Sequence, residues 1–97
     1  KIKRLIEDLL GSRARVKILK ELAINEELTI SLLIRKTKLN HVGVTKHLRY
    51  LKDVDMVQEK KFGRIKIYRY KIENIAARLF LNLIRTWEDG APSDFNS

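Results

Sequence analysis

Apolar side chains recur every three to four positions through the first quarter of the chain, with charged side chains at most positions between them. This spacing predicts amphipathic helices over residues 1–10 and 13–23. Gly11 ends the first helix and Ser12 caps the second, because glycine favours helix C-termini and serine accepts a hydrogen bond at N-termini. Both helices are expected to pack an apolar face on a common core.

The following stretch predicts two short helices joined by a tight turn. Leu28 favours a short strand ahead of them, and either Thr29 or Ser31 is expected to cap a helix over 30–36. The core residues expected from this helix are Leu32, Leu33 and Ile34.

The turn over 37–39 contains Leu39 as an apolar plug, and Asn40 is well placed to cap a helix over 41–53. Residues at i, i+4 and i+7 fix its buried face: Val44, Leu48 and Leu51. The opposite side holds His41, Val42, Thr45, Lys46, Arg49 and Lys52. This pair of helices therefore has the pattern of a helix-turn-helix whose second helix is suited to a DNA groove.

Beyond Asp55 the apolar period changes toward two, which predicts strands over 56–61 and 65–72 around a turn containing Gly63. Alternation alone leaves the buried face of the second strand open. We favour burial of the face that carries Tyr68, Tyr70 and Ile72.

Asn74 is expected to cap a final helix over 75–87, whose apolar residues cover more than half of its circumference. They are Ile75, Ala76, Leu79, Phe80, Leu83, Ile84 and Trp87. A tail over 88–97 is expected to be flexible. The order of elements predicts a mainly α fold with a small β-hairpin, a winged helix-turn-helix domain over 1–87 with extra N- and C-terminal helices.

The net charge of +9 is concentrated in one segment. Residues 35–71 hold twelve lysines and arginines against three acidic residues, whereas the other sixty residues carry nine charges of each sign. A solvated surface mixes its charges, so this segregation favours a polyanionic partner. We expect double-stranded DNA, with a merely basic surface as the alternative.

Several classes of protein are not expected. The absence of cysteine excludes disulfides, thiolate metal sites and thiol nucleophiles, and the two histidines lack nearby carboxylate ligands. No paired catalytic constellation or phosphate-binding glycine loop is present, so we expect neither an enzyme nor a cofactor. Without a long apolar run or a signal-peptide pattern, a cytoplasmic, nucleoid-associated protein with no membrane contact is expected.

Three segments, LLGSRARVKILKEL, LTISLLIRKTKLNHVGVTKHLRYLKDVDMV and KKFGRIKIYRY, resemble the ArsR-type winged-helix transcriptional regulators over roughly residues 9–72. The first contains the family's "ILxxL" block. The second matches its "HLxxL" recognition helix at residues 47–51, and the third matches in part its "GRxxYY" wing at residues 63–68. The resemblance implies a dimeric, DNA-binding regulator.

The sequence departs from this family at the position of the cysteine metal site of many members, where it has Ser31-Leu32-Leu33-Ile34. High charge, many isoleucines, a single glutamine and the absence of cysteine favour a thermophilic source, and the resemblance is taken to be to an archaeal member of the family. Asp55 stands where a glycine is common, and aspartate tolerates left-handed backbone. Gly43 costs about 1 kcal/mol of helix propensity and permits either close approach of the backbone to DNA or tight packing on the preceding helix.

Residues expected to contact bases lie on the recognition helix: His41, Val42, Thr45, Lys46 and Arg49. Methyl groups meet thymine, and lysine or arginine donates to guanine, although phosphate contact is an equally good interpretation of the two basic residues. Asn40 is expected at the start of the same interface. His47 lies beside the apolar face and is expected to be a partly buried packing residue.

Arg64 at the hairpin tip is the best candidate for insertion into the minor groove. Phosphate contacts are expected from Lys60, Lys61 and Lys66 on the strands and from Arg35, Lys36 and Lys38 before the recognition helix. Ser31 and Thr37 are expected to add neutral hydrogen bonds. The alternative is that the strand lysines only protect exposed edges from aggregation.

The predicted end helices have wider apolar faces than one chain of this length is expected to cover. We expect them to form a homodimer through Ile2, Ile6, Leu9, Leu79, Leu83 and Trp87. A two-fold dimer would place its recognition helices about 34 Å apart, one turn of the duplex. The alternative is that the last helix folds back on its own domain.

The leading interpretation is a sequence-specific, dimeric transcriptional regulator, with the helix over 41–53 in the major groove and a wing over 60–66 on the minor groove or backbone. Two alternatives remain open: a non-specific architectural DNA-binding protein, and a winged-helix protein-interaction module of the transcription machinery. The sequence identifies no operator and no effector.

Overall fold

The computed structural model describes residues 5–90, which form five helices and a three-stranded antiparallel sheet. The helices are α1 (Ile6–Leu10), α2 (Arg13–Asn25), α3 (Ile30–Thr37), α4 (His41–Asp53) and α5 (Ile75–Glu88). The strands are β1 (Glu27–Thr29), β2 (Val57–Phe62) and β3 (Ile65–Tyr70). This arrangement confirms the predicted mainly α fold, a winged helix-turn-helix with additional helices at both ends.

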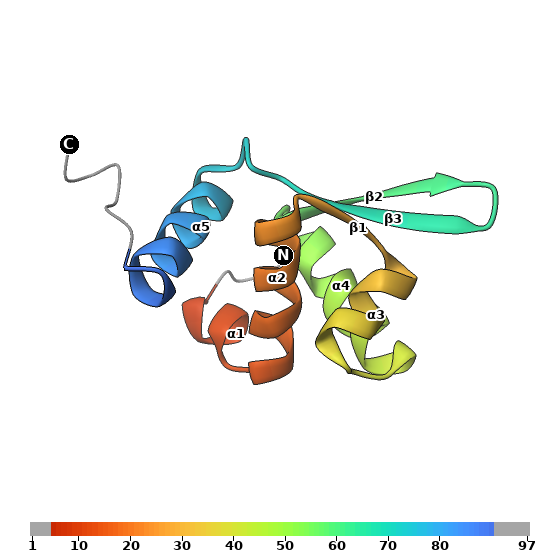
Figure 1. Cartoon of the computed structure of the whole chain (residues 1–97), viewed down its shortest axis with the longest axis horizontal. Coiled ribbons are helices and arrows are strands. Elements are labelled where there is room, and N and C mark those ends of the chain that lie inside the picture. Colours follow the sequence, from red (N-terminus) through yellow and green to blue (C-terminus); the bar gives the residue numbers. More distant parts are fainter. Residues whose placement is uncertain (1–4, 91–97) are drawn as a thin grey trace.

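The elements lie on two sides of α2 (Figure 1). On one side are α3, α4 and the β2–β3 hairpin, which projects beyond the helices as a long arm. On the other side are α1 and α5. The helix-turn-helix pair and the wing therefore share one end of the molecule, and the two outer helices share the other.

β3 is the central strand of the sheet, in the order β1-β3-β2. Phe62 pairs with Ile65 in the hairpin, which leaves Gly63 and Arg64 as a two-residue turn. Gly63 has a φ of +61°, whereas Arg64 is not among the residues with positive φ. A glycine at the first central position alone is typical of a type II′ turn, whose twist matches that of the strands.

α2 forms the centre of the core, where Ile18, Leu19 and Leu22 are fully buried. The predicted inner stripe of α4 packs against it and is also buried. The other buried apolar residues come from every element except α1: Ala23, Leu28, Leu33, Val44, Leu48, Leu51, Val54, Met56, Val57, Tyr68, Tyr70, Ala77, Leu81 and Ile84. The predicted burial of Tyr68 and Tyr70 is thereby confirmed.

Four helices begin with a side-chain cap, as the sequence predicts. In each case the side-chain oxygen accepts a hydrogen bond from a backbone N–H of the first turn, an interaction that typically contributes about 1 kcal/mol. The pairs are Ser12 with Arg15 (3.2 Å), Thr29 with Leu32 (3.2 Å), Asn40 with Gly43 (2.7 Å) and Asn74 with Ala76 (2.8 Å). Of the two candidates for α3, the cap is therefore Thr29.

Two residues predicted in the core are exposed instead. Leu32 is 36% exposed, because Leu33 is the apolar residue of α3 that points fully into the core, while Ile34 is partly buried against it. Ile72 is 43% exposed, since β3 ends at Tyr70 and the backbone turns there, with the N–H of Ile72 donating to the Tyr70 carbonyl (3.0 Å). The strand alternation therefore stops before it reaches Ile72.

The last helix folds back on its own domain along one side only. Ala77, Leu81 and Ile84 are buried there, and the first two were not part of the predicted apolar face. A second stripe remains exposed, formed by Ile75, Leu79, Leu83 and Trp87. The fold-back and an uncovered apolar face are therefore both features of α5.

Ile2, predicted at the dimer interface, and residues 91–97 of the predicted tail lie outside the described residues. None of the helices in residues 5–90 combines the length and hydropathy needed to cross a membrane.

Candidate nucleic-acid interface

The turn between α3 and α4 fixes the angle of the helix-turn-helix. Lys38 adopts left-handed backbone (φ 60°), and its N–H donates to the Ile34 carbonyl (2.8 Å). Leu39 packs against the core, as predicted for the turn. Thr37 is fully buried and donates from Oγ1 to the Leu33 carbonyl (2.8 Å), so its predicted contact with the DNA backbone is wrong.

The buried stripe of α4 turns its opposite side to solvent. Of the five residues predicted to contact bases, four are exposed: His41, Val42, Lys46 and Arg49. Val42 is 78% exposed, which is unusual for an aliphatic side chain in the first turn of a helix that packs on a core. This side of α4 therefore combines an apolar contact with cationic donors.

Thr45 differs from the other four residues. It is half-buried, and its Oγ1 is inaccessible to solvent without a hydrogen-bond partner among the described residues. The hydroxyl is therefore turned away from any groove, and only the methyl group suits the predicted role.

Gly43 is explained by the cap of the same helix. A Cβ at this position would lie 3.2 Å from Oδ1 of Asn40, the atom that caps α4, and no atom of α3 lies within 4 Å. The predicted alternative of tight packing on α3 is therefore wrong. The glycine leaves room for the cap, and Asn40 itself is exposed at the edge of the interface.

The basic residues before the recognition helix lie at the C-terminal end of α3. Arg35, Lys36 and Lys38 are all exposed and form no ion pair with the described residues. Arg35 and Lys36 could have a purely structural role, because cations stabilise the negative, C-terminal end of a helix dipole. Their position beside the start of α4 also suits contacts with phosphates.

The wing has two different faces. Lys61 lies directly opposite Lys66, and like charges at such a pair destabilise a hairpin unless an anion neutralises them. Phe62 and Ile65 lie opposite each other on the other face and are 61% and 55% exposed. Arg64 is exposed in the turn between the two faces.

Lys60 does not share the face of the other two wing lysines. Its register partner is Ile67, and its Nζ lies 3.4 Å from Oε1 of Glu27 in β1. The sequence placed Lys60 with Lys61 and Lys66 as phosphate contacts, but strand alternation separates them. A phosphate contact by Lys60 would compete with this ion pair.

Ion pairing divides the twelve basic residues of the segment 35–71 into two groups. Four form ion pairs with acidic residues: Lys52, Lys60, Arg69 and Lys71. Eight have no acidic partner within residues 5–90: Arg35, Lys36, Lys38, Lys46, Arg49, Lys61, Arg64 and Lys66. We call these eight residues the unpaired basic set, and all of them lie on α3, the following turn, α4 or the wing.

Glu59 connects the recognition helix to the wing, a role that the sequence did not indicate. Its Oε1 accepts from Nζ of Lys52 at the end of α4 (2.8 Å), and its Oε2 accepts from the hydroxyl of Tyr68 (2.8 Å). Hydrogen bonds from Lys52 and Tyr68 lower the pKa of this carboxyl. The charged carboxylate therefore holds the base of the hairpin against α4.

Arg15 holds α4 from the opposite direction. Its Nε donates to Nδ1 of His47 (3.2 Å), and its guanidinium lies 3.7 Å above the ring of Tyr50. His47 is half-buried, as predicted, and burial followed by the charges of Arg15 and Lys46 lowers its pKa. Arg15 is thus a positioning residue for the recognition helix; it lies in the segment LLGSRARVKILKEL, but the sequence indicated no role for it.

Within residues 5–90, no three histidine or acidic side chains gather in a way that would hold a metal ion.

Several solved winged-helix regulators are similar to this chain in structure. The transcriptional regulator HlyU from Vibrio vulnificus has a TM-score of 0.73 at 22% identity, covering 86% of this chain and 83% of its own. The transcriptional repressor PagR of Bacillus anthracis has a TM-score of 0.66 at 21% identity, with coverages of 79% and 85%. The transcriptional repressor BigR from Xylella fastidiosa has a TM-score of 0.70 at 19% identity, with coverages of 88% and 84%.

These likenesses show that the chain shares the fold of these solved transcriptional regulators. No protein-family model matches the sequence, and a search of curated proteins finds no match.

Proposed function

We propose that this protein is a sequence-specific transcriptional regulator that binds double-stranded DNA as a homodimer. The observation that carries the proposal is the unpaired basic set, whose eight cations lie on the elements that a winged helix presents to DNA. The similar solved structures, described as transcriptional regulators or repressors, support the same role.

In the proposed complex, α4 enters the major groove. Val42 and the methyl group of Thr45 contact thymine methyl groups, while Lys46 and Arg49 donate to guanine or to phosphates. His41 contacts a base or phosphate near the start of the helix. Asn40 acts chiefly through the cap that orients this first turn.

The surrounding cations position α4 by binding the DNA backbone. Arg35, Lys36 and Lys38 contact phosphates on one side of the groove, and Lys61 and Lys66 contact them through the wing. Arg64 reaches the minor groove, where narrow A·T-rich segments attract arginine. Lys60 adds a contact only if its ion pair with Glu27 opens.

The proposed dimer interface is the apolar surface of α1 and α5. Ile6, Leu79, Leu83 and Trp87 are 63%, 46%, 52% and 80% exposed, whereas Leu9 is partly buried against its own core. An apolar groove of about 210 Å³ connects the two helices, since its lining includes Ile6 and Leu9 of α1 and Ala76 of α5. A second copy of the chain would cover this surface and supply a second recognition helix for a palindromic site.

Selection of bound sequences from a random duplex pool tests the proposal. A regulator should enrich one operator and bind it about a thousand-fold or more tightly than random DNA. Equal affinity for all duplexes would identify an architectural protein instead. Negligible affinity for any duplex at low salt would favour the protein-interaction module and contradict DNA binding altogether.

A further inference from the structure

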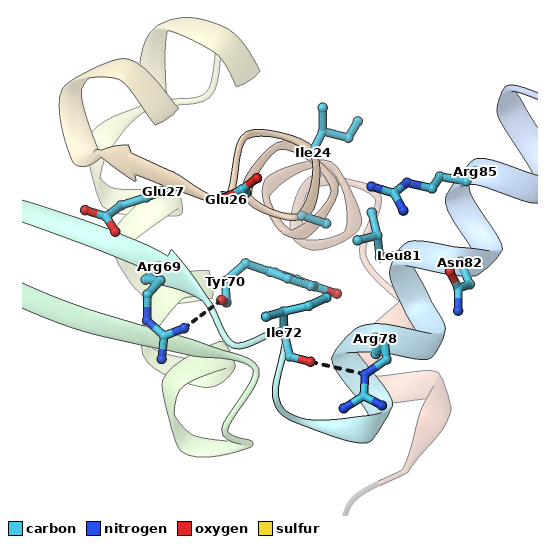
Figure 2. Close-up of a pocket in the computed structure, with 11 residues that line it drawn as sticks. Ile24, Glu26, Glu27, Arg69, Tyr70, Ile72, Arg78, Leu81, Asn82 and Arg85 are labelled. Atoms are coloured by element: carbon cyan, nitrogen blue, oxygen red, sulfur yellow. Dashed lines mark hydrogen bonds between the residues drawn. The ribbon is translucent and has the colours of Figure 1, made fainter. Parts of the chain in front are cut away.

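A cavity lies between α2, the end of β3 and α5, away from the unpaired basic set (Figure 2). Its volume is about 510 Å³. Pockets of roughly 300–1,000 Å³ hold small organic molecules in other proteins. The cavity is therefore large enough for a ligand rather than for a single ion.

Part of the cavity wall is apolar. Ile24 and Ile72 flank it and are 55% and 43% exposed, although both are branched aliphatic residues. Tyr70 and Leu81 form the wall between them (Figure 2). Burying these two isoleucines against a hydrocarbon body would remove apolar surface from water, which favours a ligand with an apolar part.

Two arginines of α5 make another part of the cavity positively charged. Arg78 and Arg85 lie seven positions apart on α5; the guanidinium of Arg85 extends toward Ile24, whereas that of Arg78 points away from it beside Ile72 (Figure 2). The guanidinium of Arg85 has no hydrogen bond or ion pair with residues 5–90. That of Arg78 uses only Nε, which donates to the Ile72 carbonyl (3.4 Å). Most of their donors are therefore free for a ligand.

The remaining charges at the cavity set the charge of its occupant. Arg69 is neutralised by Glu73 (2.8 Å), and Glu27 is paired with Lys60 (3.4 Å). Glu26 is then the remaining carboxylate of the lining against the positive charges of Arg78 and Arg85, so the lining carries one excess positive charge. A single carboxylate fits this balance better than a doubly charged phosphate.

We propose that this cavity binds a small organic acid, with its carboxylate on Arg85 and its apolar body between Ile24 and Ile72. Arginine suits this task because its planar donors match a carboxylate bidentately.

The position of the cavity makes the bound acid an effector of DNA binding, a role that rests on the proposed function. The hydroxyl of Tyr70, at the base of the wing strand, donates to the Ala77 carbonyl of α5 (2.6 Å). A ligand beside this bond contacts both the wing strand and the helix of the proposed dimer interface. If its affinity differs between the free and the DNA-bound geometry, DNA and ligand alter each other's affinity by the same factor.

Binding is tested without DNA by titrating the protein with isovalerate and phenylacetate and recording amide NMR spectra. We expect saturable shifts confined to the ends of α2 and β3 and to the first three turns of α5. The matched probes are isovaleramide and phenylacetamide, which keep the body but lack the charge. Equal shifts from acids and amides, or no saturable shifts at these residues, would overturn the proposal.

The variant Arg85→Gln should raise the dissociation constant of the acids about tenfold or more, since it removes a charge-assisted interaction. Arg78→Gln should raise it less, because it removes only a nearby positive charge of the lining. Arg13→Gln is the matched control, because Arg13 is exposed at the start of α2 and does not line the cavity. Unchanged binding by Arg85→Gln, or equal loss in the control, would contradict the assignment.

The effector role is tested by fluorescence anisotropy with the selected duplex at saturating acid. We expect the DNA affinity of the wild type to shift about fivefold or more, a typical coupling, and that of Arg85→Gln to stay at its value without acid. Because Arg85→Gln leaves the unpaired basic set intact, it should bind DNA normally without the acid. A shift in both proteins, or in neither, would remove the effector role, whereas absence of DNA binding would reject the proposed function and leave the NMR result standing.

Discussion

Arg15 joins three helices through one side chain. Its guanidinium donates to the Asp8 carbonyl at α1 and to Nδ1 of His47, and it stacks on Tyr50 of α4. Cation–π contacts and hydrogen bonds at partly buried sites contribute about 1 kcal/mol each. The orientation of the recognition helix therefore depends on a residue outside the proposed DNA interface.

Replacement of Arg15 by alanine should lower the free energy of unfolding by about 1–3 kcal/mol, because several of these contacts are lost together. Urea denaturation measures this change. Arg13→Ala is the matched control on the same helix and should change stability by no more than about 0.5 kcal/mol. Equal effects of the two substitutions would show that Arg15 does not hold α4.

His47 should make stability depend on pH in the mildly acidic range. Its pKa is lowered in the folded protein, first by burial and then by Arg15 and Lys46, so the unfolded chain binds a proton more readily. Its contribution is complete above the ordinary histidine pKa of about 6.5 and is lost as the pH falls through the lower folded value. Urea midpoints at about pH 7.5 and pH 5 should therefore differ more in the wild type than in His47→Gln. Equal differences would show that His47 is not the group that responds.

At the residue scale, the predicted helix caps depended on local patterns and were confirmed. The caps at Ser12, Asn40 and Asn74 lie within three residues of their partners, so the sequence contains all that is needed. The ion pair of Lys60 with Glu27 and the bridge through Glu59 join residues of different elements. No spacing rule indicates such pairs, because they depend on how the sheet is ordered.

At the scale of elements, the wing is the part whose charge the rest of the protein does not balance. Lys61 and Lys66 face each other across the hairpin, and Arg64 occupies its turn. A hairpin that projects from the domain gains little core packing of its own. Phosphates of a bound duplex would neutralise these positive charges, which explains why the protein itself does not.

Arg64→Ala and Lys66→Ala should each weaken duplex binding and flatten the slope of log K against log salt by about 0.9, the value for one lost phosphate contact. Lys71→Ala is the matched control, because Lys71 follows the same strand but is paired with Asp55 (2.7 Å). It should leave the slope unchanged. Unchanged slopes in all three variants would show that the wing does not contact the DNA backbone.

The element boundaries show where pattern reading fails. The period of α4 predicted both its buried stripe and its outward face, because that period is a property of one helix. The prediction of a buried Ile72 was wrong. The strand ends in a turn before α5, but the alternation of apolar residues in the sequence continues past that point. Nor did the sequence indicate how the Thr45 hydroxyl is turned: the residue lies near the border of the buried face, where the helical period alone does not decide this.

At the scale of the whole molecule, the unpaired basic set and the exposed apolar stripe of α5 occupy opposite ends. The unpaired basic set lies on α3, α4 and the wing, whereas the exposed apolar stripe lies on α5 beside α1, with α2 between them (Figure 1). On α5 itself, the stripe of Leu79 and Leu83 and the cavity arginines lie on opposite flanks of the buried side. A dimer through the stripe would therefore leave the cavity open.

Leu83→Asp should convert the proposed dimer into monomers, because it places a charge in the apolar stripe. Analytical ultracentrifugation measures the change. The matched control is Ile65→Asp, which alters an aliphatic residue of similar exposure, 55% against 52%, on the wing. A wild type that is already monomeric, or a variant that remains dimeric, would place this surface outside the interface.

The salt dependence of duplex binding by the wild-type protein tests the central claim most directly. If all eight residues of the unpaired basic set contact phosphates, log K should fall with log salt at a slope of roughly −7 per chain, and a set shared between phosphates and bases should still give about −4 or steeper. A slope near zero, or an affinity too weak to measure at low salt, would show that these cations do not bind the DNA backbone.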